Sequence, residues 1–598
     1  MPFAPIFSAI TRRRSFLLLL SSLAAFAFSG CQPLKLNTNA AQVPQVVISV
    51  LSDPKTFNYP LSQESPNIFG YTYEGLITEN GRGLLEPALA ESWEISEDSK
   101  KIVFTLRKGL KWSDGKPLTA DDVIFSYNEI YLNEAIPTDA RDVLRIGESR
   151  ALPTVRKIDD LRIEFTTPEP FAPFLRVTGL PILPAHVLRE SVQTKDSEGK
   201  PKFLSMWGID TPPSQIIVNG PYVLDNYATS QRVIFKRNPY YWRKDAEGNS
   251  QPYIERVIWQ IVESTDTSLI QFRSGGLDAV GVSPEYFSLL KKEENRGDFT
   301  IYNGGPASGT TFLSFNLNKG SKNGKLLVDP IKSSWFRNKP FRQAVAYAID
   351  RQTMINNTFR GLGEMQHSPV SVQSPYYLSP SEGLKVYDYN PQKAKELLLE
   401  AGFKYNERGE LLDEKGNRVR FTLITNAGNK TREAMGAQIK QDLSKIGIQV
   451  DFTPIAWSAF TDKLSNTLDW EAHLLGFTGG VEPNDGANIW NSSGGLHSFN
   501  QGPQAGSPVQ NWEISEWEKE IDRLMVEGAQ ELDDAKRKEI YAKFQNIVQE
   551  ELPLIYLVNP LSMGAVRNKI QGVDYSALGG AFWNLYELKV TEQKPTAF

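Results

Sequence analysis

Cysteine and histidine are scarce in this chain. Its 598 residues include one cysteine, Cys31, and four histidines. A lone cysteine cannot form an internal disulfide, and a metal site built on thiolates needs several of them. The histidines lie far apart in the sequence, and none belongs to a His-Glu-x-x-His pair. The sequence therefore predicts no disulfide framework, no bound metal and no other cofactor.

The chain also lacks the short motifs on which common hydrolases and nucleotide enzymes depend. It contains no Gly-x-Ser-x-Gly turn and no glycine-rich phosphate loop. We predict a protein that binds a solute rather than an enzyme. A secreted hydrolase acting through dispersed carboxylates is the alternative from another class, and turnover of peptides or glycosides would reveal it.

Positive charge and long apolar runs are limited as well. The formal net charge is −5, and it becomes −8 when Arg12, Arg13 and Arg14 are left out. No basic cluster with interleaved aromatic residues occurs, so nucleic-acid binding is not expected. No run after Cys31 approaches the ~20 apolar residues of a transmembrane helix. The composition, 40% hydrophobic and 23% charged, is typical of a soluble protein, and the length predicts two or three lobes.

Residues 1–30 have the three-part order of a secretory signal peptide. Three arginines precede an apolar run at 16–28, and two small residues follow it. That run is too short for a ~30 Å hydrocarbon core at about 1.5 Å per residue, so we expect cleavage. The segment Arg13-Arg14-Ser15-Phe16-Leu17 resembles the twin-arginine export motif. A basic segment of the general secretory route has a similar composition, and both routes stay open.

Cys31 is the predicted membrane attachment point. Phe28-Ser29-Gly30-Cys31 resembles the bacterial lipobox, in which the cysteine is lipidated and becomes the new N-terminus. Phe28 departs from the aliphatic residue usual there. We expect an exported monomer, in the periplasm or on the outer cell surface, with a lipid anchor on Cys31. Residues 31–45 are polar and are predicted to form a flexible tether, while the membrane that carries the anchor stays open.

Short apolar runs bounded by turn residues alternate with helical stretches, which predicts an α/β fold. Strands are expected at 46–50, 101–106 and 161–165. Thr119 is a predicted N-cap, with Asp122 as the acid of a capping box. Further helices are predicted at 341–356, 391–401, 432–446 and 513–550.

Ten short blocks follow one another in a recognisable order. They are Pro87–Trp93, Phe104–Gly109, Trp112–Pro117, Thr119–Val123, Asn219–Tyr222, Asn238–Trp242, Phe341–Val345, Ala348–Arg351, Tyr389–Pro391 and Ala401–Phe403. In these blocks the chain resembles the family 5 extracellular solute-binding proteins, the peptide-, dipeptide- and nickel-type binding components of ABC importers. The resemblance extends from about Val46 to Leu588. The blocks themselves are mostly structural: Asp114-Gly115 is a hairpin turn signal, and Arg342 and Asp350 are expected on a helix surface or in an internal ion pair.

The resemblance implies a two-lobed periplasmic-binding-protein fold with two hinge crossings. Lobe I is expected at 44–312 together with 556–598, with an inserted β-rich subdomain at about 75–215, and lobe II at 313–555. Such a protein would capture a small solute by lobe closure and deliver it to a membrane permease that works with an ATPase. Closure of this kind acts by shifting a population between open and closed forms.

In peptide-binding members of this family, an aspartate on a loop of the second lobe pairs with the free amine of the peptide. The corresponding position here falls at about Gly480, and a buried ammonium without a counter-charge is costly. Glu482 and Asp485 are candidates to supply the charge from the same loop, or they are solvated turn residues. An oligopeptide or dipeptide is the expected ligand. An opine-like conjugate, an oligosaccharide or a metal complex remains the alternative.

The other candidate ligand contacts follow from the same expected cleft. Trp457, Phe477 and Trp490 are candidates for apolar contact with the ligand, although lone aromatic residues of this kind more often belong to a core. Thr478 belongs to the cleft loop. His497 lies close to it in the sequence and is either a ligand contact or, more often for such a residue, a structural histidine. Tyr73, Asn219 and Asn316 are placed near the expected crossings.

Overall fold

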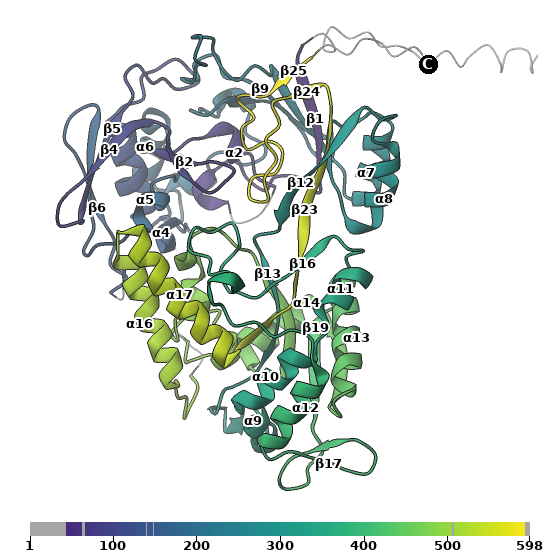
Figure 1. The fold of residues 1–598 in the computed structure, drawn as a ribbon. Coiled ribbons are helices and arrows are strands. Elements are labelled where there is room, and N and C mark those ends of the chain that lie inside the picture. Colours follow the sequence, from purple (N-terminus) through teal and green to yellow (C-terminus); the bar gives the residue numbers. More distant parts are fainter. Residues whose placement is uncertain (1–42, 63–65, 139, 148, 505–507, 592–598) are drawn as a thin grey trace, which may run out of the picture. The chain divides into compact units, whose positions relative to one another are not determined.

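The computed structural model describes residues 43–62, 66–138, 140–147, 149–504 and 508–591 (Figure 1). The chain divides into two units, residues 1–43 and 44–598, and every helix and strand named below belongs to the second. The predicted signal peptide at 1–30, Cys31 and the predicted tether as far as residue 42 lie outside the described residues. Within the described ranges, no helix combines the length and the apolar character needed to cross a membrane.

A mixed four-stranded sheet contains the first strand. Its order is β1 (Gln45–Val50), β10 (Arg256–Ile261), β9 (Arg232–Arg237), β8 (Tyr222–Ala228). Strands β1 and β10 are parallel, and the other pairs are antiparallel. The predicted strand at 46–50 is confirmed and begins one residue earlier, because Gln45 already pairs with Arg256.

A second sheet is antiparallel throughout. Its order is β4 (Ala90–Ile95), β5 (Lys101–Leu106), β7 (Arg162–Thr166), β6 (Thr154–Lys157). Strands β5 and β7 confirm two predicted strands. The predicted capping box is also present: the Thr119 side chain caps α3 (Ala120–Ile124), and the Asp122 carboxylate accepts the Thr119 N–H at 3.0 Å. Gly115 turns the predicted hairpin with φ 83°.

A five-stranded sheet organises the second half of the chain. Its order is β20 (Gln449–Ile455), β19 (Arg420–Asn426), β21 (Ala472–Phe477), β13 (Thr310–Phe315), β22 (Leu554–Tyr556). Strands β20, β19 and β21 are parallel, whereas β13 is antiparallel to both of its neighbours. Two predicted helices, α12 (Pro391–Glu400) and α13 (Lys430–Ser444), belong to this half, and α13 packs on β19 and β20.

Two long predicted helices are each divided in the structure. The prediction at 341–356 becomes α10 (Lys339–Ala348) and α11 (Arg351–Asn357), and that at 513–550 becomes α16 (Glu516–Gln530) and α17 (Asp534–Glu551). In both cases an aspartate begins the second helix. Asp350 accepts the Thr353 N–H at 2.9 Å and Asp533 accepts the Lys536 N–H at 3.0 Å. Such side chains compete with helical backbone bonding and favour a new N-terminus.

A fourth sheet connects the two halves. Its order is β11 (Ala279–Gly281), β23 (Val558–Arg567), β12 (Phe299–Pro306), and β16 (Gly363–Met365) pairs with another part of β23. The chain passes from β12 to β13 through 307–309, and it returns from β22 to β23 through Leu557. The two halves are therefore joined by two strand-to-strand connections, the two crossings expected for the fold.

The remaining elements are short hairpins and helices. The hairpins are β2–β3 (Ile77–Glu79, Leu85–Pro87), β14–β15 (Ser321–Lys322, Lys325–Leu326) and β17–β18 (Lys404–Tyr405, Leu411–Leu412), and a longer connection separates the antiparallel pair β24–β25 (Ile570–Gln571, Lys589–Val590). The helices are α2 (Phe69–Thr72), α4 (Ala140–Val143), α5 (Phe174–Val177), α6 (Ala185–Gln193), α7 (Thr265–Arg273), α8 (Pro284–Glu293), α9 (Pro330–Phe336), α14 (Trp457–Asp462) and α15 (Ala487–Trp490).

Two large hydrophobic cores draw on different stretches of the chain. The first core contains buried residues from 46–259 and 566–588, and it also includes Ala529 from α16. The second core is built from residues 312–558. A smaller cluster lies around α7, α8 and β12. This distribution supports the proposed lobe boundaries, which stay a prediction.

Candidate binding cleft

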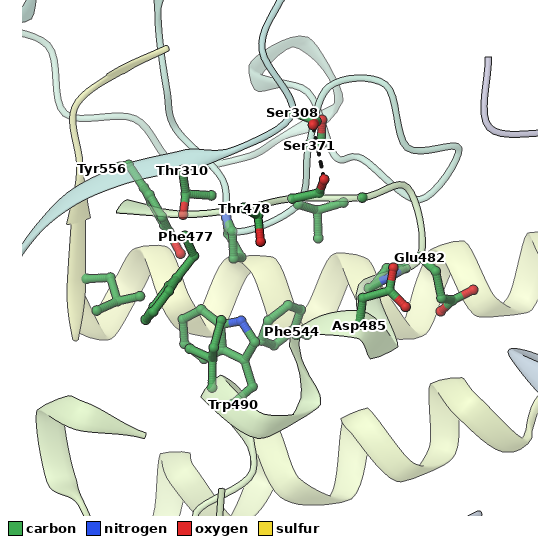
Figure 2. A pocket seen from close by; sticks show the side chains of 18 residues that line it. Ser308, Thr310, Ser371, Phe477, Thr478, Glu482, Asp485, Trp490, Phe544 and Tyr556 are labelled. Atoms are coloured by element: carbon green, nitrogen blue, oxygen red, sulfur yellow. Dashed lines mark hydrogen bonds between the residues drawn. The ribbon is translucent and has the colours of Figure 1, made fainter. Parts of the chain in front are cut away.

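A pocket of about 270 Å³ opens at the carboxyl end of β21. Its wall combines the start of β13, the segment 369–371, the loop after β21, α15, α17 and β22. Six of the candidates from the sequence line it: Phe477, Thr478, Gly480, Glu482, Asp485 and Trp490. Figure 2 shows most of their side chains around this pocket.

Aromatic side chains gather at one end of this pocket. The rings of Trp490 and Phe544 meet edge to face, with centroids 5.1 Å apart, and Phe477 lies on the other side of Trp490 in Figure 2. Only 4% of Trp490 is exposed, so this residue also belongs to the second core. An apolar end of this kind suits the hydrophobic part of a solute.

The loop after β21 is held firmly by the residues around it. The Ser308 hydroxyl donates a hydrogen bond to the Gly479 carbonyl at 3.0 Å, drawn as a dashed line in Figure 2. The Ser374 hydroxyl donates to the Val481 carbonyl at 2.5 Å. A Cβ atom on Gly479 would lie 1.9 Å from the Ser308 carbonyl oxygen, so only glycine fits there. The loop therefore presents its side chains from a fixed backbone.

Glu482 already has a cationic partner. Its carboxylate accepts a hydrogen bond from the Arg537 guanidinium at 2.8 Å, and the two side chains are only 4% and 5% exposed. Arg537 also packs against the ring of Tyr376, 4.5 Å from its centroid. The ion pair raises the pKa of Arg537, in opposition to its burial. Glu482 is a buried structural anion, and its charge is compensated within the protein.

Asp485 is placed differently. Its side chain is accessible through the pocket, and its carboxylate accepts no hydrogen bond from the described residues. Surrounding protein raises the pKa of Asp485 to about 6 by desolvation; the Glu482 charge adds to this rise and Arg176 opposes it. A Cβ atom on Gly480 would lie 2.7 Å from Asp485 Oδ2. The Asp485 carboxylate thus occupies the space that a side chain at position 480 would take.

Two further hollows extend the pocket into a longer cleft. One, of about 770 Å³, shares Asp485 with the first pocket and is lined by residues of α5, α15 and α16. The other hollow, of about 630 Å³, shares Arg176 and Val177 with the 770 Å³ hollow. It is lined mainly by residues of 59–85 and 579–586. Each hollow shares wall residues with the next, so the three adjoin one another; together they are called the candidate cleft, and their walls draw residues from both cores.

Tyr73 and Trp457 lie outside the first pocket. Tyr73 lines the 630 Å³ hollow, and its hydroxyl donates to the Ile217 carbonyl at 3.0 Å. Trp457 is 55% exposed at the start of α14 and stacks on Phe460.

Asn219, Asn316 and His497 are buried, and their polar atoms bond to the protein. The Asn219 amide donates to the carbonyls of Glu74 and Ile182, and it accepts the Glu74 N–H. The Asn316 amide bonds to the backbone of residues 468–470 and 318. His497 lies 3.0 Å from the Glu518 carboxylate and 2.9 Å from the Ile489 carbonyl. These three residues fix loops rather than face the cleft.

Several wall residues were not among the candidates. They include Ser308, Thr310, Ser371, Phe544 and Tyr556 in the first pocket. Each is brought there by tertiary packing from a distant part of the chain, and no local pattern marks them. Within the described residues, no group of three or more His, Cys, Asp or Glu is placed to hold a metal ion.

Comparison with known proteins identifies the type of chain that carries this cleft. The sequence profile of bacterial extracellular solute-binding proteins, family 5 (middle region), matches residues 85–498. A probable ABC transporter-binding protein of Deinococcus radiodurans is 32% identical, covering 87% of this chain and 88% of that protein. The oligopeptide-binding protein AppA of Bacillus subtilis is 26% identical, covering 94% and 97%.

Solved structures have the same fold. The structure of AppA in complex with a nonapeptide matches with a TM-score of 0.66 and 23% identity, over 92% of this chain and 99% of that one. The periplasmic binding protein MelB of Agrobacterium fabrum, in complex with stachyose, matches with a TM-score of 0.69 and 22% identity, over 93% and 86%. These matches, together with the profile and the relatives, show that the chain belongs to family 5 of the bacterial extracellular solute-binding proteins.

Proposed function

We propose that the protein is the substrate-binding component of an ABC importer that captures an oligopeptide or dipeptide and delivers it to a membrane permease. The cleft closes over the peptide, and a permease with its ATPase receives it. The relatives are named as binding proteins of this type, and AppA is named for oligopeptides.

The Asp485 carboxylate carries the peptide proposal. It is the charged group on the cleft loop that lacks a hydrogen-bond partner among the described residues, and it fills the side-chain space of Gly480. A peptide ammonium brought into a closing cleft needs an anion, since an unpaired buried charge is unstable. Asp485 supplies that anion from five residues further along the loop, whereas Glu482 is committed to Arg537.

The extent of the cleft favours an extended ligand. The three hollows measure about 270, 630 and 770 Å³ and share wall residues. A typical small-molecule site occupies roughly 300–1,000 Å³. The aromatic end formed by Phe477, Trp490 and Phe544 gives contact area for an apolar side chain of the peptide without selecting one particular residue type. This combination suits peptides of varied sequence.

A non-peptide solute on the same fold is the second candidate. Aromatic rings and hydroxyl groups line the 630 Å³ hollow, including Tyr59, Tyr71 and Trp583. Such walls also suit the faces of sugar rings, and MelB is named with stachyose. An opine-like conjugate or a metal complex would use the same cleft.

We further propose that the protein is exported by its signal peptide and held at the membrane by a lipid on Cys31. Residues 31–42 would then leave the body free to move above the lipid surface. The protein would act as a monomer in the periplasm or on the outer cell surface. Mass spectrometry of the membrane-extracted protein would detect a lipid on Cys31, and its loss in Cys31→Ser would release the protein.

A thermal-shift screen tests the binding function. The purified protein is heated with peptides of two to nine residues, amino-acid conjugates, oligosaccharides and metal ions. A ligand specific to the folded state raises the midpoint by mass action. We expect free-amine peptides to raise it, with no product formed. A shift with oligosaccharides alone would contradict the peptide proposal, and turnover would favour a hydrolase.

A further inference from the structure

The middle of helix α16 packs in the second core, and its last turn packs in the first core. Ile521, Leu524 and Met525 are buried in the second core. Ala529, at the last turn, is 4% exposed and belongs to the first core. A single helix therefore bridges the two walls of the cleft.

Hydrogen bonds fix this end of the helix to the segment Glu169–Ala172. The Ala172 N–H donates to the Ala529 carbonyl at 2.7 Å. The Gln530 side-chain amide donates to the Glu169 carboxylate at 2.8 Å. The other Glu169 oxygen is buried without a hydrogen-bond partner in the described part of the chain. Both bonds border the 770 Å³ hollow, whose wall includes Phe171, Ala529 and Gln530.

The contact lies away from the crossings. In Figure 1, α16 lies well to the left of β12 and β23, which carry the two connections between the halves, and only the carboxyl end of α17 approaches them, through β22. Contacts far from a hinge separate most when two lobes open, whereas contacts next to it change little. The bonds of Ala529 and Gln530 are therefore ones that opening would break.

Arg537 connects the same helix end to the loop after β21, residues 478–486, which is called the ligand loop below. Its Nε donates to the Gly528 carbonyl at 2.8 Å, its Nη2 donates to the Glu482 carboxylate at 2.8 Å, and its Nη1 donates to the Tyr376 hydroxyl. The guanidinium thus fixes the position of residue 528, which directly precedes the contact residues, relative to residue 482 of the ligand loop. A planar, forked cation can serve both acceptors at once, which a lysine ammonium in the same place cannot do as well.

We propose that residues 528–530 form a latch on Glu169–Ala172 that holds the cleft closed, and that Arg537 is the positioning residue that links this latch to the ligand loop. The proposal deepens the binding function, because closure around a solute is what the latch would stabilise. Its test needs no solute, so a failed peptide screen and a failed latch are separate results.

Hydrogen exchange of the ligand-free, full-length protein tests the latch. Gln530→Glu places a second carboxylate beside Glu169, and Gln441→Glu makes the same change at an exposed site on α13. We expect the amide hydrogen-exchange rate in a peptide spanning 169–177 to rise about tenfold in Gln530→Glu. The variant loses one hydrogen bond to Glu169 and adds repulsion between two carboxylates. Exchange across β9 should not change, and Gln441→Glu should behave as the parent protein. Unchanged exchange at 169–177, or an equal rise in β9, would overturn the latch.

Arg537→Lys tests the link to the loop. The variant keeps the positive charge, and we expect faster exchange both at 478–486 and at 169–177. Faster exchange at 478–486 alone would overturn the link while leaving the latch intact. Glu482→Gln serves as the second variant, because it keeps the residue's size while removing the charge that holds Arg537. The same paired rise is expected from it, and a rise confined to the loop would again contradict the link.

Discussion

At the residue scale, Asp485 and Glu482 show how two carboxylates three residues apart take different roles. Glu482 is paired with Arg537 and helps to fix the loop. Asp485 has no hydrogen-bond partner in the described structure and has a pKa raised to about 6. A site that leaves a carboxylate unpaired sacrifices stability in order to bind a cation.

Asp485 gives a prediction for stability against pH. Its folded-state pKa of about 6 lies above the ordinary value of 3.8, so its contribution to stability is full below about pH 4 and is lost as pH rises through 6. We expect Asp485→Asn to raise the melting temperature near pH 8 and to have little effect near pH 4. Calorimetry at the two pH values measures this. A variant less stable than the parent at pH 8 would contradict the assignment.

The buried pair gives a second prediction at this scale. Arg537→Met leaves Glu482 charged and buried, and we expect it to lower the free energy of unfolding by about 3–5 kcal/mol. Lys538 is the matched control on the same helix, since its ion pair with Glu382 is exposed, at 41% and 45%. Lys538→Ala should cost no more than ~1 kcal/mol. Denaturant unfolding compares the two, and similar losses would show that burial of the pair does not matter.

At the element scale, capping residues decide where the helices of the second core begin. Asn390 accepts the Lys393 N–H at 2.9 Å, and Pro391 opens α12. We expect Asn390→Ala to cost about 1 kcal/mol and Asn390→Ser, which keeps a capping oxygen, to cost less. Denaturant unfolding measures both variants. If serine were as costly as alanine, the cap would not be the source of stability.

Local signals of this kind are the part of the fold that could be predicted from sequence. The Thr119 capping box, the Gly115 turn and the strand β5 depend on neighbouring residues, and all were correct. The breaks before Asp350 and Asp533 were missed, because apolar spacing continues across them and only the aspartate caps mark the new helices.

The site was predictable only where the ligand loop itself supplies the wall. Residues 477–485 are contiguous and marked by the family resemblance, and the aromatic candidate Trp490 follows shortly after them, so six candidates came together. Arg537 and Phe544 reach the loop from α17 through tertiary packing, and Asn316 turns its amide to backbone carbonyls. A single sequence does not show which buried partner a polar side chain will find.

At the scale of the whole molecule, two cores joined by two strand connections form the walls of one cleft. This arrangement predicts hinge closure when a peptide binds. We expect the radius of gyration from small-angle X-ray scattering to fall when a stabilising peptide is added. Asp485→Asn at the same peptide concentration should show a smaller fall. An unchanged radius at saturation would mean that binding does not close the cleft.

The most direct test of the central claim is a calorimetric titration with one peptide in two forms, with a free amino terminus and with an acetylated one. Near pH 7 Asp485 is ionised, and we predict one-to-one binding of the free form and at least about tenfold weaker binding of the acetylated form, because a charge pair is lost. Asp485→Asn should remove most of this difference. Equal affinity for the two forms in the parent protein would contradict the account.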